Sequence, residues 1–117
     1  MSVVVYGINN CDSVKKVRVW LDARGVSYAF HDYKKQGVPE ADLKRWVAAI
    51  GWGRVLNRKG TTWRALDDAV KASVVNDAAA IAVMLAHAST IKRPVVTRGD
   101  VVIVGVDFAA LAALAAL

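Results

Sequence analysis

The order of strand-like and helix-like segments at the start of the chain constrains its fold more than any other feature. An unbroken apolar run at Val3–Tyr6 is typical of a strand covered on both faces. Asp12–Arg24 predicts a helix that ends at Gly25, and its apolar residues recur at helical spacing: Val14, Val17, Trp20 and Leu21. Aromatic residues alternate with smaller or polar ones along Ser27–Tyr33, which predicts a second strand. The chain therefore opens as strand, helix, strand.

The middle of the chain is predicted to be helical. Pro39–Gly51 starts with a proline and two carboxylates, as helices do, and continues with the apolar residues Leu43, Trp46, Val47 and Ile50. The polar and cationic stretch Gly53–Asp68 predicts a loop that leads into a short helix. A further helix is predicted from Asn76 or Asp77 to His87, with an apolar face of Ile81, Met84 and Leu85.

The end of the chain predicts a hairpin and a last helix. Two short β-rich runs, Val95–Thr97 and Val101–Val104, are separated by Arg98-Gly99-Asp100. Phe108–Leu117 is mainly alanine with leucine at every third position, which predicts a helix docked on the body and too short to cross a bilayer. The predicted order is β-α-β, a helical insertion, then β-β-α. All 117 residues are expected to form one domain.

Composition narrows the possible chemistry and the compartment. One cysteine cannot form an internal disulfide, and two widely separated histidines make a poor metal site. The net charge of +6 is scattered along the sequence, so it attracts anions without specifying which. The first residues lack the features of an export signal, and we therefore expect a reducing, cytoplasmic environment. No metal and no bound cofactor are expected.

Cys11 is the residue that most suggests chemistry. It follows the loop Gly7–Asn10 and directly precedes the first predicted helix, which Asp12 or Ser13 is expected to cap. The first N–H groups of a helix have no partner within the helix and stabilise negative charge, so they favour a thiolate, the nucleophilic form of cysteine. An inert buried cysteine is the alternative reading. The residues alone leave both open.

Five short blocks carry a resemblance to a known family. They are Tyr6-Gly7-Ile8 with Asn10-Cys11-Asp12, His31-Asp32-Tyr33, Leu56-Asn57 with Gly60-Thr61-Thr62-Trp63-Arg64, Ile91-Lys92-Arg93-Pro94, and Val104-Gly105. In this order, over nearly the whole chain, they resemble the arsenate reductase (ArsC) family and, within it, the YffB-type reductases. The resemblance implies an α/β, thioredoxin-like fold with a mixed four-stranded sheet. It also implies a cytoplasmic oxidoreductase.

The resemblance further implies the chemistry of that site. Cys11 would attack a disulfide or an oxyanion, and glutathione would resolve the covalent intermediate. Val14 stands three residues after Cys11, where a thioredoxin has its second cysteine, so the reducing thiol has to come from outside the chain. Glutathione is therefore the expected reducing co-substrate. Glutaredoxin is a further candidate partner, and the protein is expected to be a monomer without contact to membranes.

Four further residues are expected to bind substrate or glutathione beside the thiol. Arg93 matches the arginine of the family's Arg-Pro pair and would bring a permanent cation that grips an oxyanion with two donors. Pro94 is expected to be cis and to face the thiol, as in thioredoxin-like proteins. Lys59 and Arg64 would add positive charge for glutathione carboxylates or an oxyanion.

Three polar residues are more ambiguous. Asn10 either donates a hydrogen bond to the thiolate or substrate, or serves only the turn. His31 is tempting as a general base, but it lies on a predicted strand and is expected to be structural. His87 is expected to interact favourably with the dipole at the end of its helix.

The chain also departs from the family's pattern. Arsenate reductases that use glutathione and glutaredoxin place three arginines around the thiol. Here Asn57 stands at about the first position and Val106 near the third, which leaves Arg93. We therefore expect a thiol reductase whose natural substrate is not arsenate.

The main rival to an enzyme is a regulatory binding protein. Spx-type regulators share this fold and bind RNA polymerase, but they usually carry a Cys-x-x-Cys switch that is absent here. Direct nucleic-acid binding is not favoured, because no recognised motif accompanies the positive charge.

Overall fold

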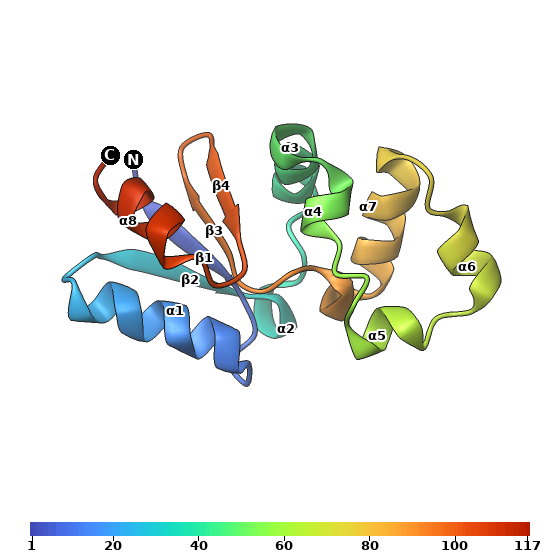
Figure 1. Cartoon of the computed structure of the whole chain (residues 1–117), viewed down its shortest axis with the longest axis horizontal. Coiled ribbons are helices and arrows are strands. Elements are labelled where there is room, and N and C mark those ends of the chain that lie inside the picture. Colours follow the sequence, from blue (N-terminus) through green and yellow to red (C-terminus); the bar gives the residue numbers. More distant parts are fainter. The chain divides into compact units, whose positions relative to one another are not determined.

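The chain divides into two compact units. The computed structural model describes all of residues 1–117. The sheet unit comprises Met1–Gly37 and Arg93–Leu117, and the helical unit comprises Val38–Lys92 (Figure 1). The helical unit is therefore an insertion between two strands of the sheet unit, as the sequence predicts. This division does not test whether the two units fold as one domain, so the single domain expected for the whole chain stays a prediction.

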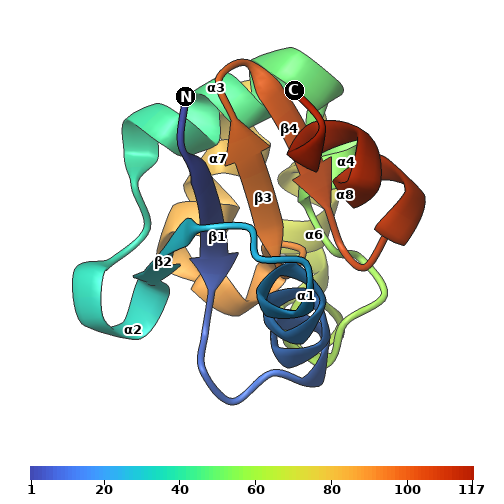
Figure 2. The ribbon, with the colours of Figure 1, turned by 90° about the vertical axis from the view of Figure 1, so that its left-hand side faces the viewer.

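Four strands form a mixed sheet, which confirms the predicted fold class. Their bounds are Val3–Gly7 for β1, Tyr28–Asp32 for β2, Val95–Arg98 for β3 and Val101–Val104 for β4. The order is β2-β1-β3-β4, with β1 at the centre between β2 and β3 (Figure 2). β1 runs parallel to β2 and antiparallel to β3. Consequently the C-terminal ends of β1 and β2 and the N-terminal end of β3 lie at the same end of the sheet. We call this end of the strands the Cys11 edge.

Two helices cover one face of this sheet. They are α1 (Asp12–Ala23) and α8 (Phe108–Ala115). Their inward side chains and those of the sheet form one buried cluster, which consists of Val3, Val5, Val17, Leu21, Val96, Ile103, Leu111 and Leu114. Side chains alternate between the faces of a strand, and Val5, Val96 and Ile103 are paired in register on this face. The expected docking of the C-terminal helix is thereby confirmed.

The helical unit contains more helix than the sequence predicts. Its helices are α3 (Glu40–Ile50), α4 (Trp52–Val55), α5 (Thr61–Arg64), α6 (Asp68–Ser73) and α7 (Asp77–Ala86), followed by the 3₁₀ turn η1 (Ala88–Thr90). α5 agrees with the short helix predicted after a loop in this stretch, whereas α4 was not predicted, because a helix of four residues is too short to show periodicity. No helix is long and apolar enough to span a membrane.

α7 buries Met84, as expected, but the rest of its buried face differs from the prediction. Ala80, Val83 and Met84 are buried, whereas Ile81 and Leu85 are only half-buried. Apolar residues surround this helix on nearly every side, so its sequence does not specify a single inward face.

The second strand ends one residue earlier than predicted. Tyr33 begins the short helix α2 (Tyr33–Gln36) instead of closing β2. The cause is Asp32, which caps α2 by accepting a hydrogen bond at Oδ1 from the backbone N–H of Lys34 over 2.9 Å. This turn places Tyr33 at the Cys11 edge.

Candidate active site at the Cys11 edge

Cys11 occupies the N-cap of α1. Its backbone is extended, with φ −132° and ψ 122°, and its carbonyl accepts the N–H of Lys15 at 3.0 Å. The prediction that Asp12 or Ser13 caps this helix is wrong, because both residues lie within its first turn. Their backbones already adopt helical angles, so neither can turn its side chain back over the helix end as a cap does.

The cap position suits a nucleophilic sulfur. The Cys11 side chain is partly exposed and makes no capping hydrogen bond. A side chain at the N-cap faces the free N–H groups of the second and third helical residues, where negative charge is stabilised. A thiolate at this position therefore has both solvent access and donors. The alternative of an inert cysteine sealed in the core does not fit this exposure.

Gly7 permits α1 to begin close to the end of β1. A Cβ added to Gly7 would lie 2.7 Å from Cγ2 of Val14, which is closer than side-chain carbons approach one another. Val14 is fully buried and cannot move aside easily. Any larger residue at position 7 would therefore displace α1, together with the cysteine at its start.

Asn9, rather than Asn10, fixes the loop before Cys11. Its side-chain Nδ2 donates to Oδ2 of the buried Asp32 at 3.2 Å, and its Oδ1 accepts from Arg18 at 3.3 Å. Asn10 is exposed and its side chain has no hydrogen-bond partner. Sequence reasoning singled out Asn10 because it adjoins the cysteine, and it missed Asn9. A contact of Asn10 with substrate stays a prediction.

Arg93 and Pro94 lead into β3 at the same edge. The Arg93–Pro94 peptide bond is cis, as expected from the resemblance. Pro94 is buried, and its carbonyl accepts the N–H of Gly105 at 2.9 Å. Arg93 is half-buried, yet its guanidinium makes neither a hydrogen bond nor an ion pair. The permanent cation expected here is therefore present and uncommitted.

Tyr33 is a site residue that the sequence analysis missed. Its side chain is 5% exposed, and its hydroxyl has no hydrogen-bond partner in the structure. Burial raises the pKa of Tyr33 well above its ordinary value, the nearby Tyr6 adds to this rise, and the charge of Arg93 opposes it. An unpaired buried hydroxyl costs about 1–3 kcal/mol of stability. The signal available in the sequence was the position of Tyr33 in the same block as His31 and Asp32.

His31 has contacts that fit the expected structural role, whereas the expected interaction of the His87 side chain with the helix dipole stays a prediction. Nε2 of His31 lies 2.8 Å from the carbonyl oxygen of Gly37, so that nitrogen must carry the proton that bonds it. The His31 ring also packs 5.2 Å from the Tyr6 ring and 6.0 Å from the Tyr33 ring, measured between centroids. His87 ends α7, and its backbone N–H donates to Val83 at 2.8 Å.

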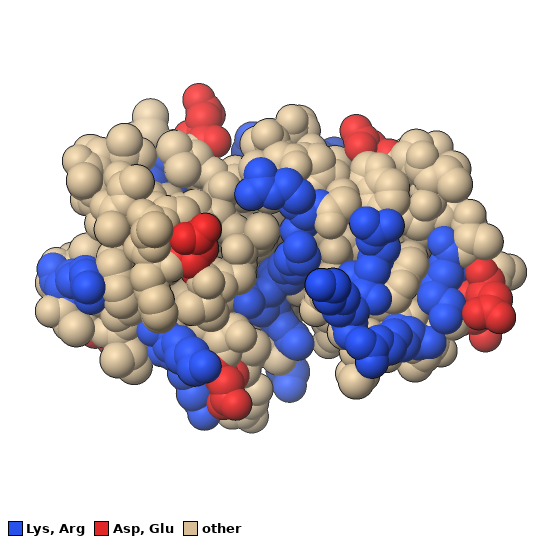
Figure 3. Space-filling model, viewed as in Figure 1, with Lys and Arg blue, Asp and Glu red and all other residues tan.

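The other predicted cations, Lys59 and Arg64, belong to the helical unit. Both are exposed, and Figure 3 shows Lys and Arg side chains gathered over α4 and α5. Lys59 donates its backbone N–H to the side-chain oxygen of Asn57 at 3.1 Å, so Asn57 serves the turn. A role of Lys59 and Arg64 toward Cys11 stays a prediction.

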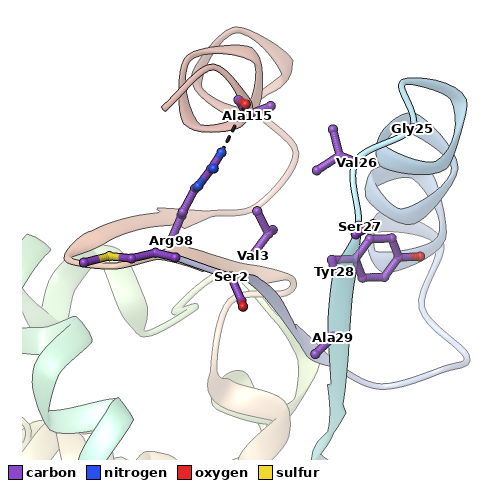
Figure 4. Close-up of a pocket in the computed structure, with 10 residues that line it drawn as sticks. Ser2, Val3, Gly25, Val26, Ser27, Tyr28, Ala29, Arg98 and Ala115 are labelled. Atoms are coloured by element: carbon purple, nitrogen blue, oxygen red, sulfur yellow. Dashed lines mark hydrogen bonds between the residues drawn. The ribbon is translucent and has the colours of Figure 1, made fainter.

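A hollow of about 560 Å³ lies at the opposite edge of the sheet, between the start of β2 and the end of α8 (Figure 4). Arg98 and Val3 line it, and no thiol does. Because β1 starts there and ends at the other edge, this hollow is not part of the Cys11 site. No group of three or more His, Cys, Asp or Glu side chains is arranged to hold a metal ion.

Comparison with known proteins identifies the family. A family model described as ArsC family matches residues 6–114. The chain belongs to the ArsC family. An uncharacterized protein of Haemophilus influenzae is 35% identical over 103 residues, which are 88% of this chain and 90% of that protein.

Two solved structures of family relatives share the fold. A protein named YffB is 50% identical, with a TM-score of 0.92 over 97% of this chain and 98% of that one. An arsenate reductase (ArsC) related protein from Brucella melitensis is 45% identical, with a TM-score of 0.75 over 97% of this chain and 93% of that one. The resemblance read from the five sequence blocks is therefore confirmed. The chain has the arsenate reductase-like, thioredoxin-type fold of thiol reductases.

Proposed function

We propose that this protein is a glutathione-dependent thiol reductase with Cys11 as its nucleophile. The observation that carries the proposal is the placement of a partly exposed thiol at the N-cap of α1, with its side chain bound to nothing. Family membership supports the same class of oxidoreductase. Because the chain has one cysteine, each turnover has to use thiols from outside it.

The reaction on a disulfide proceeds by three exchanges. The Cys11 thiolate attacks one sulfur of the substrate, forms a mixed disulfide with it, and releases the other half as a thiolate. A glutathione thiolate then attacks the substrate sulfur of that mixed disulfide, which frees Cys11. A second glutathione reduces the resulting glutathione adduct. Overall, one substrate disulfide becomes two thiols and two glutathiones become one glutathione disulfide.

Arg93 is the cation best placed to assist at the Cys11 edge. Its guanidinium is uncommitted, and a planar fork of donors matches the carboxylates of glutathione or an oxyanion. The other two positions of the family's arginine trio hold a neutral amide, Asn57, and an exposed aliphatic residue, Val106. With one arginine of three, the chain is poorly equipped for arsenate. We therefore propose a disulfide or related thiol adduct as the natural substrate.

The compartment follows from this chemistry. Cys11 has to be regenerated by reduced thiols, and a glutathione pool of that kind is found in the cytoplasm. We therefore place the protein there, acting as a monomer, with glutaredoxin as an alternative source of the second thiol.

The first test is whether Cys11 exchanges with glutathione disulfide. The purified protein is incubated with oxidised glutathione and its intact mass is measured, and the expected result is one added glutathione. Reduced glutathione should then remove it. Cys11→Ser is the matched control and should stay unmodified. Absence of the adduct in the wild-type protein, under conditions where a small-molecule thiol exchanges, would contradict the proposed function.

A further inference from the structure

An open apolar groove lies on the surface of the sheet unit between α1 and the start of α8, two helices that lie side by side (Figure 1). Its volume is about 480 Å³. Three large apolar side chains form its floor: Val19, Trp20 and Phe108. The groove shares no residue with the hollow beside Arg98, and all of its lining belongs to the sheet unit. It is therefore a separate feature of the covering helices.

The fold leaves part of this floor in contact with water. α1 sends Val17 and Leu21 into the core, and Val19, which lies between them in the sequence, faces outward. Val19 is 66% exposed and Phe108 is 43% exposed. The rings of Trp20 and Phe108 stack with centroids 5.9 Å apart, which links the two helices without covering either exposed residue. A cluster of large apolar side chains on a protein surface indicates a place that another molecule covers.

Three cations and no carboxylate line the same groove. They are Lys15, Lys16 and Arg24, and all three residues are exposed. None of them forms a salt bridge within the chain. The guanidinium carbon of Arg24 lies 3.8 Å from the centre of the Trp20 ring, so one wall of the groove is both aromatic and cationic. Charges that the fold does not pair attract an anionic partner to this place.

Charge and shape together favour one kind of occupant. A second copy of this chain would bring the same three cations against one another in a symmetric contact, which is unfavourable. A lipid surface offers no projecting side chain to fill a concave groove. A protein segment that carries a large apolar side chain among carboxylates matches both the floor and the cations around it.

We propose that the groove between α1 and α8 docks an acidic segment of a partner protein, with a large apolar side chain of that segment seated against Val19 and Phe108. The carboxylates of the segment pair with the surrounding cations. Cys11 caps the same helix, and Lys15 lies four residues after it, about 6 Å along the helix axis. A protein held in the groove is therefore close to the thiol. The docking itself does not depend on the proposed function.

Two labelled peptides test this docking. The first is a helical peptide with leucine on one face and glutamate on the other, and the second has lysine in place of every glutamate. Fluorescence anisotropy is measured with the Cys11→Ser protein, so that no thiol chemistry contributes. The acidic peptide should bind saturably, and the lysine peptide should bind at least about tenfold more weakly. The affinity of the acidic peptide should fall as the salt concentration rises.

Variants made in the same Cys11→Ser protein locate the binding. Lys15→Glu/Lys16→Glu should weaken binding of the acidic peptide about tenfold or more, and so should Val19→Glu, which places a carboxylate on the floor of the groove. Lys34→Glu/Lys35→Glu is the matched control, because it makes the same change of net charge at exposed lysines of α2, outside the groove. It should leave the affinity within about twofold. All of these side chains are exposed, so the melting temperatures should stay equal.

Several results would overturn the proposal. They are no saturable binding of the acidic peptide, equal binding of the two peptides, and an equal loss of affinity in the two double variants. A wild-type dimer that Val19→Glu dissociates would assign the groove to a second copy instead. Flotation with phosphatidylglycerol vesicles that Lys15→Glu/Lys16→Glu abolishes, without peptide binding, would assign it to lipid. The adduct of Cys11 with glutathione disulfide tests the proposed function separately from all of these.

Discussion

An arginine lies just before the start of β3 and another at its end, and the two arginines are held very differently. Arg98 donates from one terminal nitrogen to the carbonyls of Leu114 at 3.2 Å and Ala115 at 3.1 Å, at the end of α8 (Figure 4). Arg93 is also half-buried, but its guanidinium makes no hydrogen bond or ion pair. At one edge of the sheet the fold therefore uses the donors of its arginine. At the other edge, where Cys11 lies, it leaves them open.

This difference separates a structural cation from a functional one. A cation at the C-terminus of a helix stabilises the helix dipole and pairs carbonyls that have no intrahelical partner. A half-buried cation without such a partner has lost part of its hydration and gained nothing from the fold in return. A protein is expected to retain such a cation when a ligand supplies the missing contacts. The predictions below test whether the two arginines can be told apart by experiment.

The largest expected effect comes from Arg93→Ala. The rate of mixed-disulfide formation with glutathione disulfide, measured by intact mass, should fall about 10- to 100-fold, because charge-assisted hydrogen bonds to the ligand are lost. The free energy of unfolding should change by no more than about 0.5 kcal/mol, since no hydrogen bond or ion pair within the fold is removed. Arg93→Lys should recover only part of the rate, because it keeps the charge without the planar fork.

Arg98→Ala is the matched control for that measurement. It should leave the exchange rate of Cys11 unchanged. Equal losses of rate in the two alanine variants would show that positive charge acts at long range, and the distinction between the two ends of β3 would fail.

The second prediction concerns stability, where the loss of Arg98 should matter more than the loss of Arg93. Arg98→Ala should lower the free energy of unfolding by about 1–2 kcal/mol, because the Ala115 carbonyl loses its donor, the Leu114 carbonyl keeps only the N–H of Leu117, and the end of α8 loses a favourable charge. Denaturant unfolding followed by circular dichroism measures this loss. Arg98→Lys should lose less, since an ammonium keeps the charge and can reach one carbonyl. A stability loss as large in Arg93→Ala would contradict the comparison.

The sequence predicts the strands and helices around the two arginines better than it predicts which arginine has a partner. Helical periodicity places α1 to within one residue at its C-terminal end, and the turn at Gly99 predicts the hairpin of β3 and β4. Both are local patterns. Whether an arginine has a partner depends on contacts such as that of Arg98 with Ala115, which are distant in sequence. The Arg-Pro pair singles out Arg93 through the family resemblance, but no local pattern shows which of the two arginines has a partner in the fold.

The sequence analysis missed Asn9 and Tyr33 for the same reason. Asn9 matters because it reaches Asp32, 23 residues away, and Tyr33 matters because tertiary packing buries its hydroxyl. The cysteine itself was predictable, since a thiol between a strand and a helix is visible in the sequence. Its position as the cap was not, because Asp12 and Ser13 are both better capping residues than cysteine. Close packing of α1 on Gly7 therefore overrides the local preference.

The smallest effect is expected at alkaline pH and concerns the Arg93 end of β3. Burial and Tyr6 raise the pKa of Tyr33 above its ordinary value of 10.0, while Arg93 moderates the rise and His31 packs against the ring. Above pH 10 the unfolded chain loses this phenolic proton and the folded protein keeps it, so stability falls as the pH rises and is unaffected below. At pH 10.5 this group should lower the free energy of unfolding by about 0.8 kcal/mol.

Denaturant unfolding at pH 8 and pH 10.5 isolates that contribution. Tyr33→Phe should lose less stability between the two pH values than the wild type, by about 0.8 kcal/mol. Tyr28→Phe, in which the other two tyrosines remain, should lose as much as the wild type. An identical loss in Tyr33→Phe and the wild type would mean that the phenol ionises freely in the folded protein. The phenol would then be solvated in the folded protein, which would contradict its burial at the Cys11 edge.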